Sequence, residues 1–177
     1  MIVSGERTKK EILSWVKTII FAVLFALLVN HVIVVNAAVP TGSMEDTIMV
    51  GDRVIAFRGS YLFDEPKRYD IVVFRPPDEE EVLYVKRIIG LPGDKIDVRD
   101  GRVYINDSAE PIADKYIREA QHIEEEQVFN VPEGHYFMMG DNRNHSNDSR
   151  RWHQPYVAKN KILGKVVFRY FPIPKTY

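Results

Sequence analysis

The sequence predicts a mainly β domain preceded by one N-terminal transmembrane helix, and two patterns support this fold class. Residues 18–35 are apolar except for Thr18, Asn30 and His31, and a helix of about 20 such residues crosses the hydrocarbon core of a bilayer. Beyond Asn36, short runs rich in Val, Ile, Tyr and Phe are separated by Gly, Pro and Asp, which is typical of an all-β domain. We therefore divide the chain into an N-terminus at 1–17, an anchor at 18–36 and a β domain at 37–177.

The charges around the apolar segment predict its orientation. Basic residues precede it, whereas the first charged residues after it are the acidic Glu45, Asp46 and Asp52. Because positive charge stays on the cytoplasmic side, we expect a single-pass protein of the cytoplasmic membrane, with residues 1–17 in the cytoplasm and the β domain on the outer, periplasmic or extracytoplasmic, face. The alternative is a cleavable signal peptide, since residues 19–29 have the length of an h-region and residues 35–37 resemble a cleavage site.

The β domain contains seven runs with the composition and length of strands. They are 53–57, 71–75, 82–89, 95–99, 102–106, 135–139 and 162–171. Asp100-Gly101 separates two of these runs and predicts a two-residue hairpin, because a type I′ turn needs positive φ at both central positions.

Composition excludes several classes of function. A chain of 177 residues is long enough for one compact domain and a membrane segment. Its net charge of -1 offers no basic field for nucleic acid. The chain has no cysteine, and its five histidines lack the spacing of zinc ligands, so we expect neither a thiol nucleophile nor a bound metal or cofactor.

A candidate nucleophile follows the apolar segment. Residues 41–45 read Thr-Gly-Ser-Met-Glu, and the Ser43 hydroxyl attacks only if one group takes its proton and another stabilises the charge on the substrate carbonyl. The Thr41 hydroxyl and the Ser43 backbone N–H are candidate oxyanion donors. Taken alone, a Gly-Ser pair after proline is more often an ordinary loop.

Lys86 is a candidate general base because it lies inside an apolar strand. A free lysine is almost entirely protonated at neutral pH, so it becomes a base only where desolvation lowers its pKa. Two-residue alternation places Lys86 on the face of Val82, Tyr84 and Ile88, which is apolar enough for that effect. The alternative is a lysine that extends its ammonium group to water at a sheet edge.

A third polar motif lies at residues 140–150, directly after the apolar residues 136–139. It reads Gly-Asp-Asn-Arg-Asn-His-Ser-Asn-Asp-Ser-Arg. Such a loop is either a solvated turn or a hydrogen-bonded support that fixes a catalytic lysine.

These three motifs, in this order behind an apolar segment, resemble bacterial type I signal peptidases. The serine motif of that family reads roughly Ser-x-Ser-Met-x-Pro-Thr and is followed by Gly-Asp. Here residues 41–47 read Thr-Gly-Ser-Met-Glu-Asp-Thr and are followed by Gly51-Asp52. The lysine motif matches over residues 84–94, and the C-terminal motif, Gly-Asp-Asn-x-x-x-Ser-x-Asp-Ser-Arg, is complete at 140–150.

The resemblance implies a signal-peptidase-type β-sheet catalytic domain and a role for each matching residue. Ser43 would be the nucleophile and Lys86 the neutral base, with Thr41 in the oxyanion hole. The residues that support the base would be Ser146, which would hydrogen-bond Lys86, together with Asp148 and Arg150. The residues that line the pockets for small side chains would be Pro40, Met44 and Val85.

The implied activity is the removal of signal peptides from exported preproteins after small residues, at Ala-x-Ala sites. The partners would be preproteins and membrane lipid, without nucleic acid or metal. Residues 95–135 would form a small cap-like excursion. The family proline is replaced by Asp46, for which we expect altered loop rigidity without loss of chemistry, and a stabilising Asp46→Pro substitution if the local φ is compatible.

Two alternatives use the same residues differently. A self-cleaving repressor-type protease shares the Ser/Lys chemistry but normally carries a DNA-binding helical domain, and nothing in this sequence resembles one. An inactive, membrane-tethered β module that binds exported proteins is the alternative from another class.

Overall fold

The structure is a computed structural model, and it describes residues 3–117, 119, 121–122 and 125–177. Four positions of the predicted excursion, 118, 120, 123 and 124, lie outside the described residues. The chain divides into two compact units, of which the first ends at Val34 and the second comprises Val35–Tyr177.

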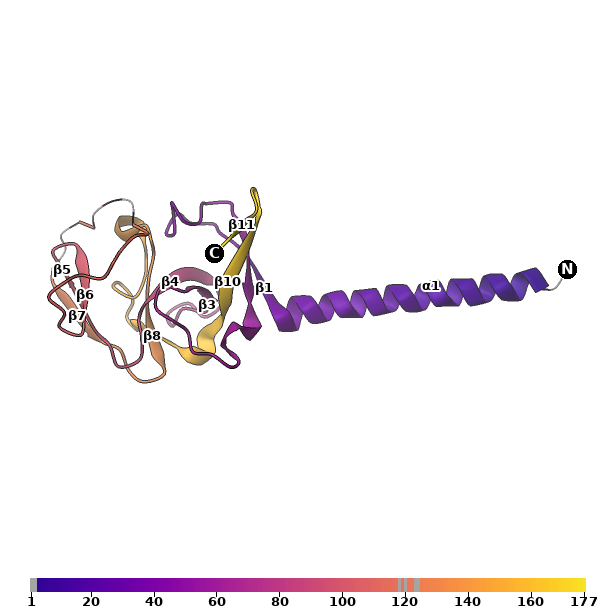
Figure 1. Cartoon of the computed structure of the whole chain (residues 1–177), viewed down its shortest axis with the longest axis horizontal. Helices are drawn as coiled ribbons and strands as arrows, with labels where there is room; N and C mark the ends of the chain where they lie inside the picture. Colours follow the sequence, from indigo (N-terminus) through magenta and orange to yellow (C-terminus); the bar gives the residue numbers. More distant parts are fainter. Residues whose placement is uncertain (1–2, 118, 120, 123–124) are drawn as a thin grey trace. The chain divides into compact units, whose positions relative to one another are not determined.

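The N-terminal unit is a single long helix. Helix α1 (Val3–Leu28) continues as a π-helical turn, η1 (Val29–Ile33), and the stretch Thr8–Ile33 is long and apolar enough to cross a membrane (Figure 1). The helix contains residues 18–33 of the predicted anchor and begins before it. Val34 and Asn36, which we assigned to the anchor, lie instead in strand β1 (Val34–Ala38).

The larger of two sheets in the described part of the second unit has eight strands. Its order is β1-β2-β10-β3-β4-β8-β9, and β11 pairs with β10. The strands are β1, β2 (Arg53–Phe57), β3 (Ile71–Phe74), β4 (Tyr84–Gly90), β8 (His135–Met139), β9 (Tyr156–Ala158), β10 (Ile162–Phe171) and β11 (Lys175–Thr176). Short 3₁₀ turns are η2 (Arg58–Tyr61), η3 (Arg143–His145) and η4 (Lys159–Lys161).

The smaller sheet has the order β6-β5-β7 and lies within the stretch predicted as the excursion. Its strands are β5 (Lys95–Arg99), β6 (Arg102–Ile105) and β7 (Gln127–Asn130), which lie side by side in Figure 1. The turn between β5 and β6 has φ of 50° at Asp100 and 67° at Gly101, and Arg99 pairs with Arg102. The predicted hairpin is therefore confirmed.

Strand β3 explains why the large sheet has a continuous apolar run at its centre. Ile71 and Val73 pack into one core cluster, while Val72 and Phe74 pack into another, so both faces of this strand are covered. Strand β4 lies next to β3, with Val72 opposite Lys86. A lysine in the middle of this sheet is consequently withdrawn from water.

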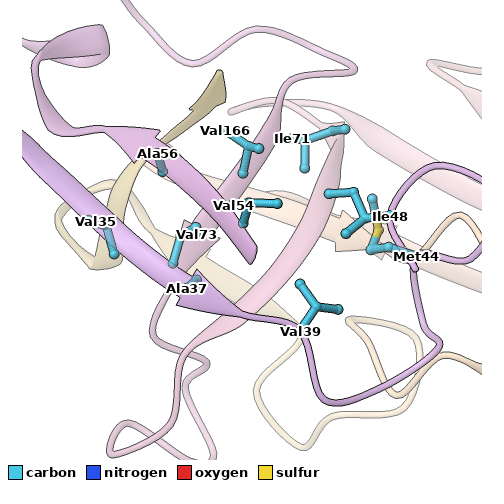
Figure 2. Close-up of a cluster of buried hydrophobic side chains, with 10 residues drawn as sticks. All are labelled: Val35, Ala37, Val39, Met44, Ile48, Val54, Ala56, Ile71, Val73 and Val166. Carbon is cyan, nitrogen blue, oxygen red and sulfur yellow. The ribbon is translucent and has the colours of Figure 1, made fainter. Parts of the chain in front are cut away.

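The loop between β1 and β2 is fixed by two buried apolar side chains. Met44 and Ile48 are 1% and 0% exposed and belong to the same cluster as Val54, Val73 and Val166. Figure 2 shows Met44 and Ile48 beside each other in this cluster. The residue before Met44 is thereby held at a defined place beside the sheet.

All seven predicted strands are present, and the fold is mainly β as expected. The ends differ by up to two residues, most at 82–89, where the strand begins at Tyr84. Strands β1, β7, β9 and β11 were not predicted, because β1 continues the apolar run of the helix and the other three are only two to four residues long.

Candidate active site

Ser43 and Lys86 meet beside the core cluster that contains Met44 and Ile48. Ser43 lies in the loop between β1 and β2, and Lys86 lies in the middle of β4. The Lys86 Nζ donates a hydrogen bond of 2.5 Å to the Ser43 Oγ. Lys86 is only 3% exposed and Ser43 only 7%, so the contact is shielded from bulk water. When the lysine is neutral, the same two atoms are within reach for transfer of the serine proton to the Nζ.

The pKa of Lys86 is lowered from 10.5 to about 8, chiefly because burial penalises its charged form. The carboxylates of Asp148 and Asp141 oppose this effect, while the positive charge of Arg150 adds to it. The Tyr84 ring, with its centroid 5.3 Å from the Nζ, covers the lysine on the expected face of the strand. The prediction that Val82 also lies in this strand is wrong, since Val82 precedes β4 and is exposed.

Asp148 and Arg150 form a closed ion pair beneath the site. Both side chains are 0% exposed, and the Arg150 Nε and Nη2 donate to the Asp148 carboxylate at 2.8 and 2.9 Å. Burial alone would raise the pKa of Asp148, but the hydrogen bonds and charge of Arg150 hold it below its usual range. The Gly140 N–H donates to the same carboxylate at 3.0 Å. This pair therefore fixes the 140–150 loop, while its support of a catalytic base stays a prediction.

The predicted hydrogen bond between Ser146 and Lys86 is not formed in the structure. The Ser146 Oγ is fully buried, and its interaction is with the Asp148 carboxylate, whose pKa it lowers, rather than with Lys86. It lies against Gly140, where an added methyl group would collide with this Oγ and with the carbonyl oxygen of Ser43. Ser146 is thus close to the backbone of Ser43, and its action on the lysine stays a prediction.

A second buried ion pair, which sequence reasoning missed, links both catalytic segments. Arg87 follows Lys86, and its Nε and Nη2 donate to the Asp141 carboxylate at 2.8 and 2.6 Å. Thr47, in the loop after Ser43, donates its hydroxyl to the same carboxylate at 2.5 Å. The sequence signals for the Arg87–Asp141 pair were a second charge inside an apolar strand and an aspartate in the 140–150 motif.

The backbone of the serine loop is also tied to the 140–150 loop. The Asn142 N–H donates to the Ser43 carbonyl oxygen at 3.1 Å, and its side-chain amide donates to the Gly42 carbonyl oxygen at 3.0 Å. The candidate nucleophile, Ser43, is therefore held from two directions, by the buried Met44 side chain and by Asn142.

A pocket of about 310 Å³ opens beside the two residues. Its walls include all three predicted substrate-binding residues, Pro40, Met44 and Val85, and the predicted oxyanion residue Thr41. The exposed Thr41 lies at the pocket surface near Ser43. The structure thus brings the predicted pocket residues and the candidate dyad together.

Asp46 has a backbone conformation that proline cannot adopt. Its φ is 72°, in the left-handed region, whereas the proline ring fixes φ near −65°. The condition for a stabilising Asp46→Pro substitution is therefore not met. Aspartate is one of the few residues that adopt this region with modest strain, which is a physical reason for its presence here.

Comparison with known proteins places these features in a family. A family model described as signal peptidase, peptidase S26, matches residues 12–171. A probable signal peptidase I-2 of Synechocystis sp. is 37% identical, over 90% of this chain and 73% of its own. Signal peptidase I of Bacillus licheniformis is also 37% identical, over 93% of this chain and 91% of its own.

A probable thylakoidal processing peptidase of Arabidopsis thaliana is 41% identical over 87% of this chain, which spans 42% of that protein's length. The family model covers the serine loop, strand β4 and the 140–150 loop, so the resemblance seen in the three motifs is confirmed over most of the sequence. The chain belongs to the signal peptidase family, peptidase S26.

Proposed function

We propose that this chain is a membrane-bound serine endopeptidase that removes N-terminal signal peptides from exported preproteins, with Ser43 as nucleophile and Lys86 as general base. One observation carries the proposal, the buried contact of 2.5 Å between the Lys86 Nζ and the Ser43 Oγ. Family membership and the names of the relatives support the substrate class. The lowered pKa of Lys86 supports its role as a base.

The chemistry uses one proton carrier for two steps. Neutral Lys86 accepts the Ser43 hydroxyl proton as the Oγ bonds to the carbonyl carbon at the cleavage site. The Ser43 N–H and the Thr41 hydroxyl stabilise the negative oxygen that results. When the C–N bond breaks, Lys86 returns the proton to the leaving amine. Water then attacks the acyl-enzyme and gives a proton to Lys86, which passes it to the departing Ser43 Oγ, and the signal peptide leaves with a free carboxylate.

The pocket beside the dyad favours small residues before the cleavage site. Met44, Val85 and Pro40 give it apolar walls, and Met44 is 1% exposed, which leaves little room for it to move aside. Alanine side chains fill such shallow depressions without displacing the walls. This supports an Ala-x-Ala preference.

The long apolar stretch Thr8–Ile33 supports a membrane anchor, and the charges that flank it support an orientation with the N-terminus in the cytoplasm. The catalytic unit would then lie on the outer face. Protease added to cells with a permeable outer layer should digest the unit that follows Val34. Full protection of that unit would contradict the orientation.

The experiment that tests the activity is single-turnover cleavage of a preprotein by the full-length chain. Ser43→Ala and Lys86→Ala should be inactive, and Lys86→Arg should be nearly inactive because guanidinium stays protonated. Ser146→Ala should weaken cleavage less. Cleavage by folded Lys86→Arg at the wild-type rate would contradict the dyad, and binding of preproteins without cleavage by the wild-type chain would favour the inactive module.

A further inference from the structure

One segment of the excursion reaches the catalytic loops. It comprises residues 112–117, between β6 and β7, and it is tied to the smaller sheet by the Ile112 N–H, which donates to the Val103 carbonyl oxygen at 2.8 Å. Asp114 and Tyr116, two residues apart in this segment, each contact a different buried arginine beside the active site. Neither residue belongs to the three sequence motifs.

Asp114 holds the 140–150 loop through Arg143. The Arg143 Nη1 and Nη2 each donate to the Asp114 carboxylate at 2.7 Å, and the arginine side chain is 2% exposed. The Arg143 Nε donates to the Gly140 carbonyl oxygen at 3.2 Å, and its own carbonyl oxygen accepts from Arg150 at 2.8 Å. Asp114 therefore neutralises a buried cation that braces the loop at both ends.

Tyr116 holds the lysine strand through Arg87. The Arg87 Cζ lies 3.6 Å from the centre of the Tyr116 ring, which covers one side of the guanidinium plane. The same guanidinium group donates to Asp141 and to the Tyr69 carbonyl oxygen, the latter at 2.7 Å. Arg87 directly follows Lys86 in β4. A shift of Arg87 is therefore passed to the base through the strand backbone that the two residues share.

We propose that Asp114 and Tyr116 are positioning residues, which clamp the 140–150 loop and strand β4 so that Lys86 and Ser43 stay in contact. This rests on the proposed function. Bidentate pairing and close contact with an aromatic ring both restrict the position of a guanidinium group.

The rate of proton transfer depends on the fixed position of Lys86 relative to Ser43. A displacement of about 1 Å at a catalytic group can cost about a hundredfold in rate. Loss of Asp114 leaves Arg143 buried without its carboxylate, and the loop must move to bring that cation to water. Movement of the loop also admits water to Lys86 and changes its distance from Asp148 and Arg150, so the pKa of Lys86 should rise toward its usual value.

The test compares variants of the full-length chain in cleavage of one preprotein. The variants are Asp114→Ala, Asp114→Asn and Asp114→Glu, with Tyr116→Leu and Tyr116→Phe. Tyr104→Leu is a matched control, because its ring also stacks on an arginine of the excursion, Arg99, at 4.2 Å and lies outside the site. For each variant we would measure kcat, KM, the pH profile of kcat and the thermal midpoint.

Asp114→Ala and Asp114→Asn should lower kcat by about tenfold to a hundredfold while KM changes by less than about twofold. The acid limb of kcat should move to higher pH, which loss of stability alone would not produce. Asp114→Glu should restore part of kcat. Tyr116→Leu should lower kcat, Tyr116→Phe should preserve it, and Tyr104→Leu should match the wild type.

An Asp114→Asn variant that keeps both kcat and the acid limb of the wild type would overturn the inference. So would equal losses of kcat in Tyr116→Leu and Tyr104→Leu. If Asp114→Ala does not fold, Asp114→Asn and the Tyr116 pair carry the test. Wild-type cleavage that Ser43→Ala does not abolish would contradict the proposed function and this inference together, whereas Ser43-dependent cleavage with unaffected clamp variants contradicts the inference alone.

Discussion

The rate of cleavage should follow the deprotonation of Lys86. The pKa of this group falls from 10.5 to about 8 because it is buried between β3 and β8 beside Ser43. One pKa unit corresponds to about 1.36 kcal/mol, so the surroundings of Lys86, chiefly its burial, disfavour the charged form by about 3 kcal/mol. At pH 7 the neutral fraction becomes about 9%, against about 0.03% for a lysine with the ordinary value.

The assay is single-turnover cleavage of a preprotein between about pH 6 and pH 10, under conditions in which chemistry limits the rate. The rate should rise with pH along an acid limb whose midpoint lies near 8 in the free enzyme. Bound substrate excludes more water and should lower that midpoint further. The protein must stay folded across the range, which circular dichroism at each pH would verify.

Two results would refute this reasoning. A midpoint near 10 would show that the lysine keeps its ordinary pKa and that burial is not the activating effect. A limb near 6.5 that persists in a Lys86 variant would show that a histidine titrates instead, and His145, which lines the pocket, would be the residue to examine.

Substitutions at three positions test the same geometry. Lys86→Met should abolish cleavage. At pH 7 it should also raise the free energy of unfolding by up to about 3 kcal/mol in chemical denaturation, because it removes a buried charge. This gain in stability should shrink between about pH 8 and about pH 10.5, where the native lysine is neutral while the unfolded one is still protonated. Asp46→Pro should lower both cleavage and the thermal midpoint, because proline cannot adopt the φ of this residue. Asp46→Gly should change stability by less than about 1 kcal/mol, since glycine adopts the required φ. Equal thermal midpoints for the two variants would contradict the local geometry. Gly140→Ala should lower kcat by more than about tenfold, because its methyl group displaces the Ser43 carbonyl or Ser146, and an unchanged kcat would show that the two loops are not packed as described.

The sequence was sufficient for the parts of the fold that local pattern determines. Strands β2, β5, β8 and β10 were predicted with their observed ends, since each is an apolar run bounded by turn residues. The hairpin at Asp100 followed from the conformational preference of a single dipeptide. Strand β1 could not be separated from the helix, because the apolar character continues from residue 32 into Val34 and Val35 and periodicity does not distinguish a buried strand from a helix end.

The candidate site divides in the same way. Ser43 and Lys86 were singled out by their motifs, but their contact could be seen only in the folded sheet, since they are 43 positions apart in sequence. The pairing of Arg87 with Asp141, over 54 residues, depends on β4 lying next to β8. Nor does sequence pattern reveal the left-handed backbone at Asp46, where the family resemblance suggested the opposite conformation.

The most direct test of the central claim is to trap the covalent intermediate. Full-length protein mixed with a preprotein at a pH above that of the acid limb, quenched in acid and digested, should yield a peptide in which the carboxyl end of the signal peptide is esterified to Ser43. The ester should be absent in Lys86→Arg, since no neutral base is then in contact with the hydroxyl. An ester on a different residue, or one that forms on Ser43 equally fast in Lys86→Arg, would contradict the account.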